Sequence, residues 1–204
     1  PGRTNRYEVS YGVDLAVNVT NPSIVACREL RLAIMRRHMD MNKATYLQIT
    51  SLYSRIANYW KYFIGQTEQL KRLDVVNQKA RSEDKFSQWQ RENNMDANLL
   101  GKFASIYTDY KPYAKHAVYY SEGFRASSLA RMAGAMKPLY DAYERHEAAN
   151  ANVKGKKPEI SQDTVTKYIT SAKAAYRANL KEFDLGTEKE MFAEMTRLYH
   201  DNVP

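Results

Sequence analysis

The stretch from Ala57 to Lys71 constrains the fold of this chain most, because it is the most aromatic segment and joins two periodic runs. In the run that leads into this stretch and through its first half, apolar residues recur at spacings of four, three and four: Leu52, Ile56, Tyr59 and Phe63. This spacing predicts one apolar stripe along a helix. Downstream, Leu70 and Leu73 begin another stripe. Gly65 can adopt the left-handed conformation that ends a helix, so a helix–turn–helix joint is predicted there.

Asn58 lies away from this apolar stripe. At about 100° per residue it is turned roughly 120° from Leu52, toward the side that carries Ser51, Arg55 and Tyr62. An Asn opposite the core is either solvated or faces a ligand, and helix geometry alone leaves both interpretations open.

The rest of the chain predicts an all-α fold. Six prolines and eight glycines in 204 residues are few, which favours helices over a turn-rich β architecture. Predicted helix starts are Asn21-Pro22, Asn42, Ser161 and the pair Thr187–Glu190. Predicted breaks are Gly65, Asn93-Asn94, Pro112 and Gly186, and Pro138 is predicted to kink its helix or to mark a joint. We therefore expect a multi-helix domain of antiparallel helix hairpins.

Two segments are expected to be non-helical. Residues 6 to 11 alternate in polarity, so residues 1–20 are predicted to be a short extended segment that precedes a helical domain over residues 21–204. Residues 147–160 lack periodicity and are predicted to be an exposed loop.

No catalytic, metal or cofactor motif is visible in the sequence. The four histidines lack metal-ligand spacing, the single cysteine, Cys27, excludes an intrachain disulfide, and no phosphate-binding glycine pattern occurs. Cys27 is expected to be a buried, inert thiol. Arg28, Arg31 and His38 fall within the apolar sector of their helix, so we expect them to pair with carboxylates of neighbouring helices or to face another domain.

The net charge of +8 raises nucleic acid or an acidic protein as an alternative partner. The charges are interspersed, however, and the one dense basic run, at Lys154, Lys156 and Lys157, is interpreted as a solvated loop. A tyrosine-rich stretch could be an aromatic platform for bases or peptides, or a set of half-buried helix contacts: Tyr107, Tyr110, Tyr113, Tyr119 and Tyr120. No apolar run of about 18 residues is present, and Arg3 and Arg6 are not followed by the apolar core of a signal peptide.

Three segments resemble a known family at consistent spacing. They are the opening Pro1-Gly2-Arg3-Thr4-Asn5-Arg6-Tyr7, the helix Leu32–Met39 and the Asn58-Tyr59-Trp60-Lys61 motif. Together they resemble the bacterial serine dipeptidyl-peptidases typified by dipeptidyl-peptidases seven and eleven. In that family a helical domain is inserted into a chymotrypsin-like double barrel and covers the active-site cleft.

The resemblance implies a function for the whole parent protein. The family's catalytic His and Asp precede the opening segment and its Ser follows the helical insert, so this chain would contain none of the triad. The parent would be a periplasmic or secreted homodimer that releases dipeptides from peptide substrates, and the barrel would be the partner of this domain. By the motif match, Asn58 would accept a hydrogen bond from the substrate's free α-ammonium group. The competing hypothesis is an independent basic helical module that binds nucleic acid or an acidic protein.

Overall fold

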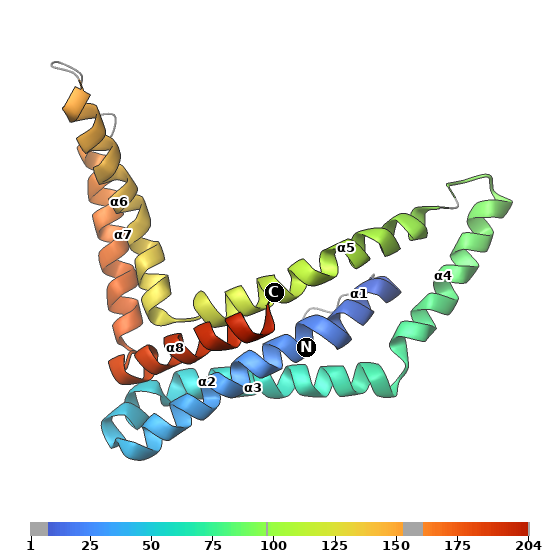
Figure 1. Cartoon of the computed structure of the whole chain (residues 1–204), viewed down its shortest axis with the longest axis horizontal. Coiled ribbons are helices and arrows are strands. Elements are labelled where there is room, and N and C mark those ends of the chain that lie inside the picture. The colour runs from blue at the N-terminus through green and yellow to red at the C-terminus, as the bar shows by residue number, and fades with distance from the viewer. Residues whose placement is uncertain (1–7, 97, 153–160, 204) are drawn as a thin grey trace.

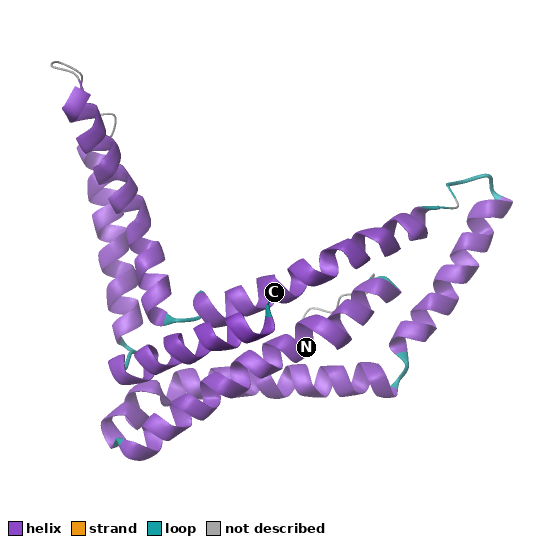
Figure 2. Cartoon of the chain, in the orientation of Figure 1, coloured by secondary structure: helices purple, strands orange, loops and turns teal. Residues whose placement is uncertain are grey.

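The computed structural model describes residues 8–96, 98–152 and 161–203, and within these ranges every regular element is a helix (Figures 1 and 2). The elements in chain order are α1 (Ser10–Leu15), η1 (Ala16–Thr20), α2 (Asn21–Met41), α3 (Lys43–Arg72), α4 (Val75–Glu92), α5 (Leu99–Tyr119), η2 (Tyr120–Phe124), α6 (Ser128–Asn152), α7 (Gln162–Leu180) and α8 (Leu185–Asn202). Here η1 and η2 are π-helical turns. The predicted all-α class is confirmed, and α2–α3 and α6–α7 are antiparallel hairpins.

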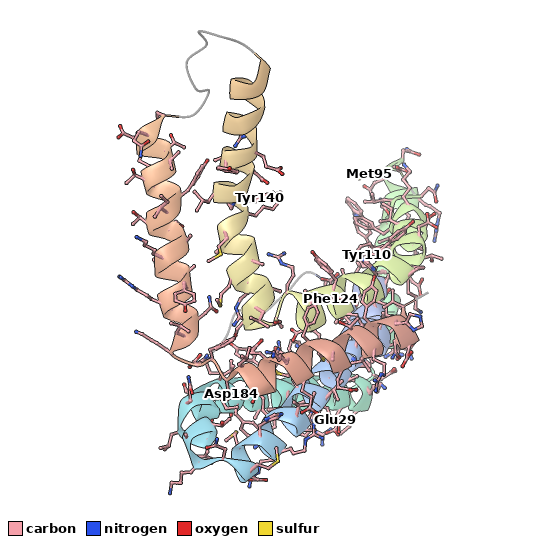
Figure 3. The ribbon with its side chains drawn as sticks, turned by 60° about the vertical axis from the view of Figure 1, so that its left-hand side comes forward. Glu29, Met95, Tyr110, Phe124, Tyr140 and Asp184 are labelled. Carbon is pink, nitrogen blue, oxygen red and sulfur yellow. The ribbon has the colours of Figure 1, made fainter. Side chains whose placement is uncertain are left out.

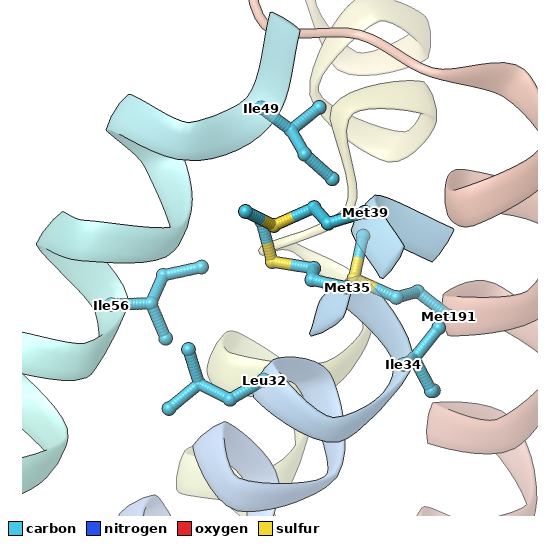
Figure 4. Packing of buried hydrophobic residues seen from close by; sticks show 7 residues of the cluster. All are labelled: Leu32, Ile34, Met35, Met39, Ile49, Ile56 and Met191. Carbon is cyan, nitrogen blue, oxygen red and sulfur yellow. The ribbon is translucent and has the colours of Figure 1, made fainter. Parts of the chain in front are cut away.

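The main core lies where α2, α3 and α8 meet (Figure 4). It is built from buried aliphatic and methionine side chains: Leu32, Ile34, Met35, Met39, Ile49, Ile56 and Met191. Met35 is fully buried at its centre. Each such side chain contributes roughly 1.5–3 kcal/mol on burial, so this cluster stabilises the hairpin and fastens α8 to it.

The N-terminal part of the chain differs from the prediction. Residues 10–20, expected to be extended, are helical, and α1, η1 and α2 follow one another without a break. Val13, Leu15 and Val17 are buried, and this packing overrides the local alternation that suggested a strand. Asn21 is accordingly no helix cap. It is buried within the continuous helix, and its side-chain amide donates to Gln66 Oε1, 3.1 Å away. Residues 1–7, which carry part of the resemblance, lie outside the described residues.

The predicted joint at Gly65 is wrong, because α3 runs through it to Arg72. The chain turns instead at Asp74, whose φ of 50° lies in the left-handed region. A glycine inside a helix costs only about 1 kcal/mol. Packing of α3 along α2 outweighs that cost, and Asn21 also donates to Thr67 Oγ1, just beyond the glycine. Pro112 likewise lies inside α5 rather than ending it, and Pro138 lies within α6, so it marks no joint between two helices.

Two of the predicted helix caps, Asn42 and Ser161, are confirmed. The Asn42 side chain accepts from the Ala44 amide at 2.8 Å, and Ser161 Oγ accepts from the Thr164 amide at 3.3 Å. The break at Asn93-Asn94 is also confirmed, since α4 ends at Glu92.

The start of the last helix is corrected. Asp184 rather than Thr187 caps α8, accepting from the Thr187 amide at 2.8 Å. Gly186, predicted as a break, lies inside α8.

The α6–α7 hairpin projects from the body as an arm (Figure 1). Helix α6 continues to Asn152, so residues 147–152 of the predicted loop are helical, and the rest of that prediction, 153–160, lies outside the described residues. Seen from the side, the arm with Tyr140 stands apart from α5 with Tyr110 (Figure 3). Among the described helices none is long and apolar enough to cross a bilayer.

Candidate functional site

Asn58 lies in the second half of α3, on the exposed side of the helix. None of the hydrogen bonds among the described residues uses its side chain, so the amide is open to solvent or a ligand. The three turns of helix around it carry a mixed polar and aromatic surface, of which Tyr59 and Tyr62 remain 61% and 54% exposed. We call this surface of α3, from Ser51 to Tyr62, the Asn58 face.

An ion pair fixes one end of the Asn58 face. Arg55 donates to both carboxylate oxygens of Glu182, which lies between α7 and α8, at 2.7 and 2.5 Å. The same guanidinium donates to Ser51 Oγ at 3.0 Å. Hydrogen bonding from Arg55 lowers the pKa of Glu182. Arg55 therefore ties the base of the α6–α7 arm to the Asn58 face.

A second cation contacts the aromatic rings beside the face. The Arg28 guanidinium on α2 lies 5.6 Å from the ring centre of Tyr59 and 5.2 Å from that of Phe63. It also forms a forked hydrogen bond with Glu122 in η2, at 3.0 and 2.7 Å. Such planar, bidentate pairs hold geometry as well as charge. Trp60, next to Tyr59, packs against the main core.

Beneath Arg28 lies a buried polar cluster. Burial lowers the pKa of Arg31, and Glu122 and Glu188 oppose that shift. Glu188, only 2% exposed, accepts from Ser127 Oγ at 3.0 Å and from the Ser128 amide at 2.9 Å. A carboxylate from α8 thus caps the start of α6, which is favourable at the positive end of a helix dipole. This cluster fixes where the arm begins.

The basic groups in the apolar sector therefore pair internally, as expected. Besides Arg28 and Arg31, His38 Nε2 lies 2.7 Å from Glu190 Oε2, and Arg37 forms an ion pair with the same carboxylate. The partner carboxylates themselves were not identified from the sequence. Glu122 lies 94 residues from Arg28, and no local pattern signals that contact.

No catalytic constellation is present in the part of the chain that the structure describes. No group of three His, Cys, Asp or Glu residues there could hold a metal ion. Cys27 is fully buried, and burial followed by the charge of Glu122 raises its pKa to about 12, so its thiol is no nucleophile. The chemistry available is hydrogen bonding, ion pairing and aromatic contact at the Asn58 face.

Comparison with known proteins gives these features a context. The peptidase S46 family model matches residues 1–204. The chain is 37% identical over 110 residues to dipeptidyl-peptidase 7 of Porphyromonas endodontalis, covering 54% of the chain and 13% of that protein. It is 33% identical over 150 residues to dipeptidyl-peptidase 7 of Porphyromonas gingivalis, covering 70% of the chain and 21% of that protein. It is 28% identical over 208 residues to an Asp/Glu-specific dipeptidyl-peptidase of Capnocytophaga gingivalis, covering 100% of the chain and 27% of that protein.

The chain thus spans between 13% and 27% of the length of these relatives. The match of the family model extends over all 204 residues, including the three segments that carry the resemblance. The chain therefore belongs to the peptidase S46 family.

Proposed function

We propose that this chain is the helical cap of a serine dipeptidyl-peptidase, a domain that covers the active-site cleft of a catalytic barrel encoded elsewhere in the same polypeptide. One combined observation carries the proposal. The chain matches the family along its whole length and spans at most 27% of the relatives named above. A domain of this kind contributes binding and enclosure, while the nucleophile and base come from outside it.

The reaction of the parent is the release of dipeptides from the amino end of oligopeptides. Two of the relatives are named dipeptidyl-peptidase 7 and one is named an Asp/Glu-specific dipeptidyl-peptidase. An enzyme that always cleaves after the second residue must hold the substrate's α-ammonium group at a fixed distance from its nucleophile. An α-ammonium carries only donors, so the groups that hold it must be acceptors.

Asn58 is our candidate for one of these acceptors. Its side chain is exposed, and it stands on a face that is braced by the Arg55–Glu182 ion pair and that includes Tyr59, whose ring Arg28 contacts. Bracing of this kind limits the movement of a binding group, which improves the positioning of a tethered substrate. In this account the parent is a periplasmic or secreted homodimer, as the family resemblance implies.

The alternative, a basic module for nucleic acid, has less support. Many of the basic side chains already contact carboxylates of the same chain, including Arg28, Arg36, Arg37, Arg55, Lys102 and Lys137. Duplex DNA titrated at two salt concentrations tests it directly, since phosphate binding weakens steeply with salt.

The test of the proposed function compares the intact parent with the 204-residue chain. Both are incubated with an oligopeptide that has a free amino terminus and with its acetylated form, and products are identified by mass spectrometry. The proposal expects dipeptides only from the intact parent acting on the free peptide. Dipeptide release by purified chain alone would place the catalytic residues within it, and a parent that releases no dipeptides would remove the peptidase role.

A further inference from the structure

Helix α5 carries two apolar stripes, of which only one is covered by the body of the domain. The covered stripe packs toward α1, η1 and α2 and consists of Leu100, Ala104, Tyr107, Ala114 and Val118. Its members are buried or half-buried, and Tyr107 also donates to Glu8 at 2.9 Å. The contact between α5 and the body is therefore complete without the second stripe.

The second stripe lies one residue earlier at each step, about 100° around the helix. Its large side chains are Leu99, Phe103, Ile106, Tyr110, Tyr113 and Tyr120, with exposed fractions of 38%, 38%, 61%, 47%, 68% and 49%. With about 150–250 Å² for each aromatic side chain, this stripe exposes on the order of 600 Å² of mainly apolar surface. A patch of this size on one helix marks an interaction site.

The spacing of the exposed stripe specifies the shape of what covers it. Including the small, exposed Ala117, the steps are four, three, four, three, four and three residues. This is a heptad seam. It runs along α5 from residue 99 because the helix continues through Pro112, and Tyr120, the first residue of η2, is its last position. A seam of three heptads, roughly 33 Å long, is complementary to another helix with the same repeat. A flat sheet or an extended peptide does not match this spacing.

We propose that the seam of α5 binds an amphipathic helix contributed by the same polypeptide from outside residues 1–204. This inference rests on the proposed function, under which the chain is part of a longer peptidase. The length of the relatives supports a helix from the same polypeptide, because they extend well beyond the 27% or less of their length that the chain matches. An intramolecular helix also meets the seam at high effective concentration, without the entropic cost of recruiting a separate protein.

Charges beside the seam define the chemistry of this helix further. Lys102 and Asp109 lie one heptad apart on the same flank, and Lys102 is exposed while contacting Asp96 at 2.6 Å. The occupant should therefore carry apolar residues at alternating three- and four-residue spacing, with a basic residue placed opposite Asp109 and an acidic one opposite Lys102.

Cysteine accessibility tests the inference. Ile106→Cys places a thiol in the seam, and Thr108→Cys places one on the exposed opposite side of the same helix, while native Cys27 is buried. Each variant is labelled with a maleimide, as the isolated chain and as the intact parent, and labelling is read peptide by peptide by mass spectrometry. Ile106→Cys should label at least about tenfold more slowly in the parent than in the isolated chain, and Thr108→Cys should label equally in both.

A photoreactive group attached at the I106C site then identifies the occupant. We expect cross-links to a segment of the same polypeptide outside residues 1–204, with the apolar spacing described above, under conditions where the parent is dilute. Equal labelling of Ile106→Cys in chain and parent overturns the inference. Cross-links to a second copy or to another protein also overturn it. The readout does not depend on activity, so a covered seam in a parent that releases no dipeptides separates this inference from the proposed function.

Discussion

Arg28 and Glu122 form a forked ion pair, with Nε and Nη2 of the arginine 3.0 and 2.7 Å from the carboxylate oxygens, although 94 residues separate them. The pair joins α2 to η2, and the Arg28 cation also lies over Tyr59 and Phe63 of α3. One contact therefore connects the hairpin that carries Asn58 to the segment from which the arm begins.

Glu122→Gln should destabilise the chain by about 2–3 kcal/mol, because it leaves the cations of Arg28 and Arg31 without their shared carboxylate. The value is below that of a fully buried pair, since the side chains of Arg28 and Glu122 keep 16% and 18% exposure. Urea unfolding followed by circular dichroism measures it. Asp40→Asn, which breaks the exposed Arg36 pair, is the control and should cost less than about 1 kcal/mol. Equal effects of the two changes would show that the Arg28–Glu122 pair adds no more stability than the exposed Arg36–Asp40 pair.

Asp184 should make stability depend on acid pH. Burial alone would raise the pKa of Asp184, but hydrogen bonds from the Thr187 hydroxyl and amide and from Thr45 outweigh it and lower the pKa. A lowered pKa in the folded state adds stability that is present above the unfolded value of about 3.9 and is lost as pH falls through the folded value. Asp184→Asn should therefore cost about 1 kcal/mol at pH 7, and the difference from wild type should begin to shrink as pH falls below about 4. A difference that is constant from pH 7 to pH 3 would contradict this.

Cys27 should be unreactive in the native chain. Its pKa of about 12 and its complete burial both suppress the thiolate, so labelling by a disulfide reagent at pH 8 should be slower than that of a model thiol by at least about 1,000-fold. The same thiol should react at the ordinary rate in guanidinium chloride. Fast native labelling would mean that the contact of α2 with η2 and α8 opens readily.

Local sequence signals predicted the helix starts correctly where a side chain forms a hydrogen bond with a backbone amide close to it in the sequence. Asn42 and Ser161 cap helices because their side chains reach amides two or three residues away, and this depends on nothing distant. Gly65 and Pro112 misled because each is only a local cost, and helix packing on either side outweighs it. Once Pro112 no longer ends α5, the apolar positions after it extend the exposed stripe.

For the candidate site, the sequence predicted the type of partner that its charged residues contact, but not which residues these partners are. Charged residues in an apolar sector were expected to pair with carboxylates or to face another domain, and Arg28, Arg31 and His38 have carboxylate partners. Which carboxylates serve depends on how η2 and α8 fold back onto α2, and spacing along the chain does not encode that. The exposure of Asn58 was predicted correctly from the helical wheel, whereas its role came only from the family resemblance.

In the parent enzyme, Asn58→Ala should lower kcat/KM by about ten- to a hundredfold, since a hydrogen bond to a charged group is worth roughly 1.5–3 kcal/mol. Part of the loss should appear in kcat, because the held amine also positions the scissile bond. The isolated chain should lose no more than about 0.5 kcal/mol of stability. Gln69→Ala, an exposed amide roughly 16 Å further along α3, is the control and should leave the kinetics unchanged. A destabilised chain with normal kinetics in the parent would make Asn58 a structural residue.

Photo-cross-linking tests most directly whether this chain covers the substrate. A peptide whose first residue carries a benzophenone is bound to the parent with its nucleophilic serine replaced, irradiated and mapped by mass spectrometry. The cap account predicts cross-links on the Asn58 face of α3, competed by unlabelled peptide with a free amino terminus and not by its acetylated form. Cross-links confined to residues outside 1–204 would contradict the claim that this domain covers the active-site cleft.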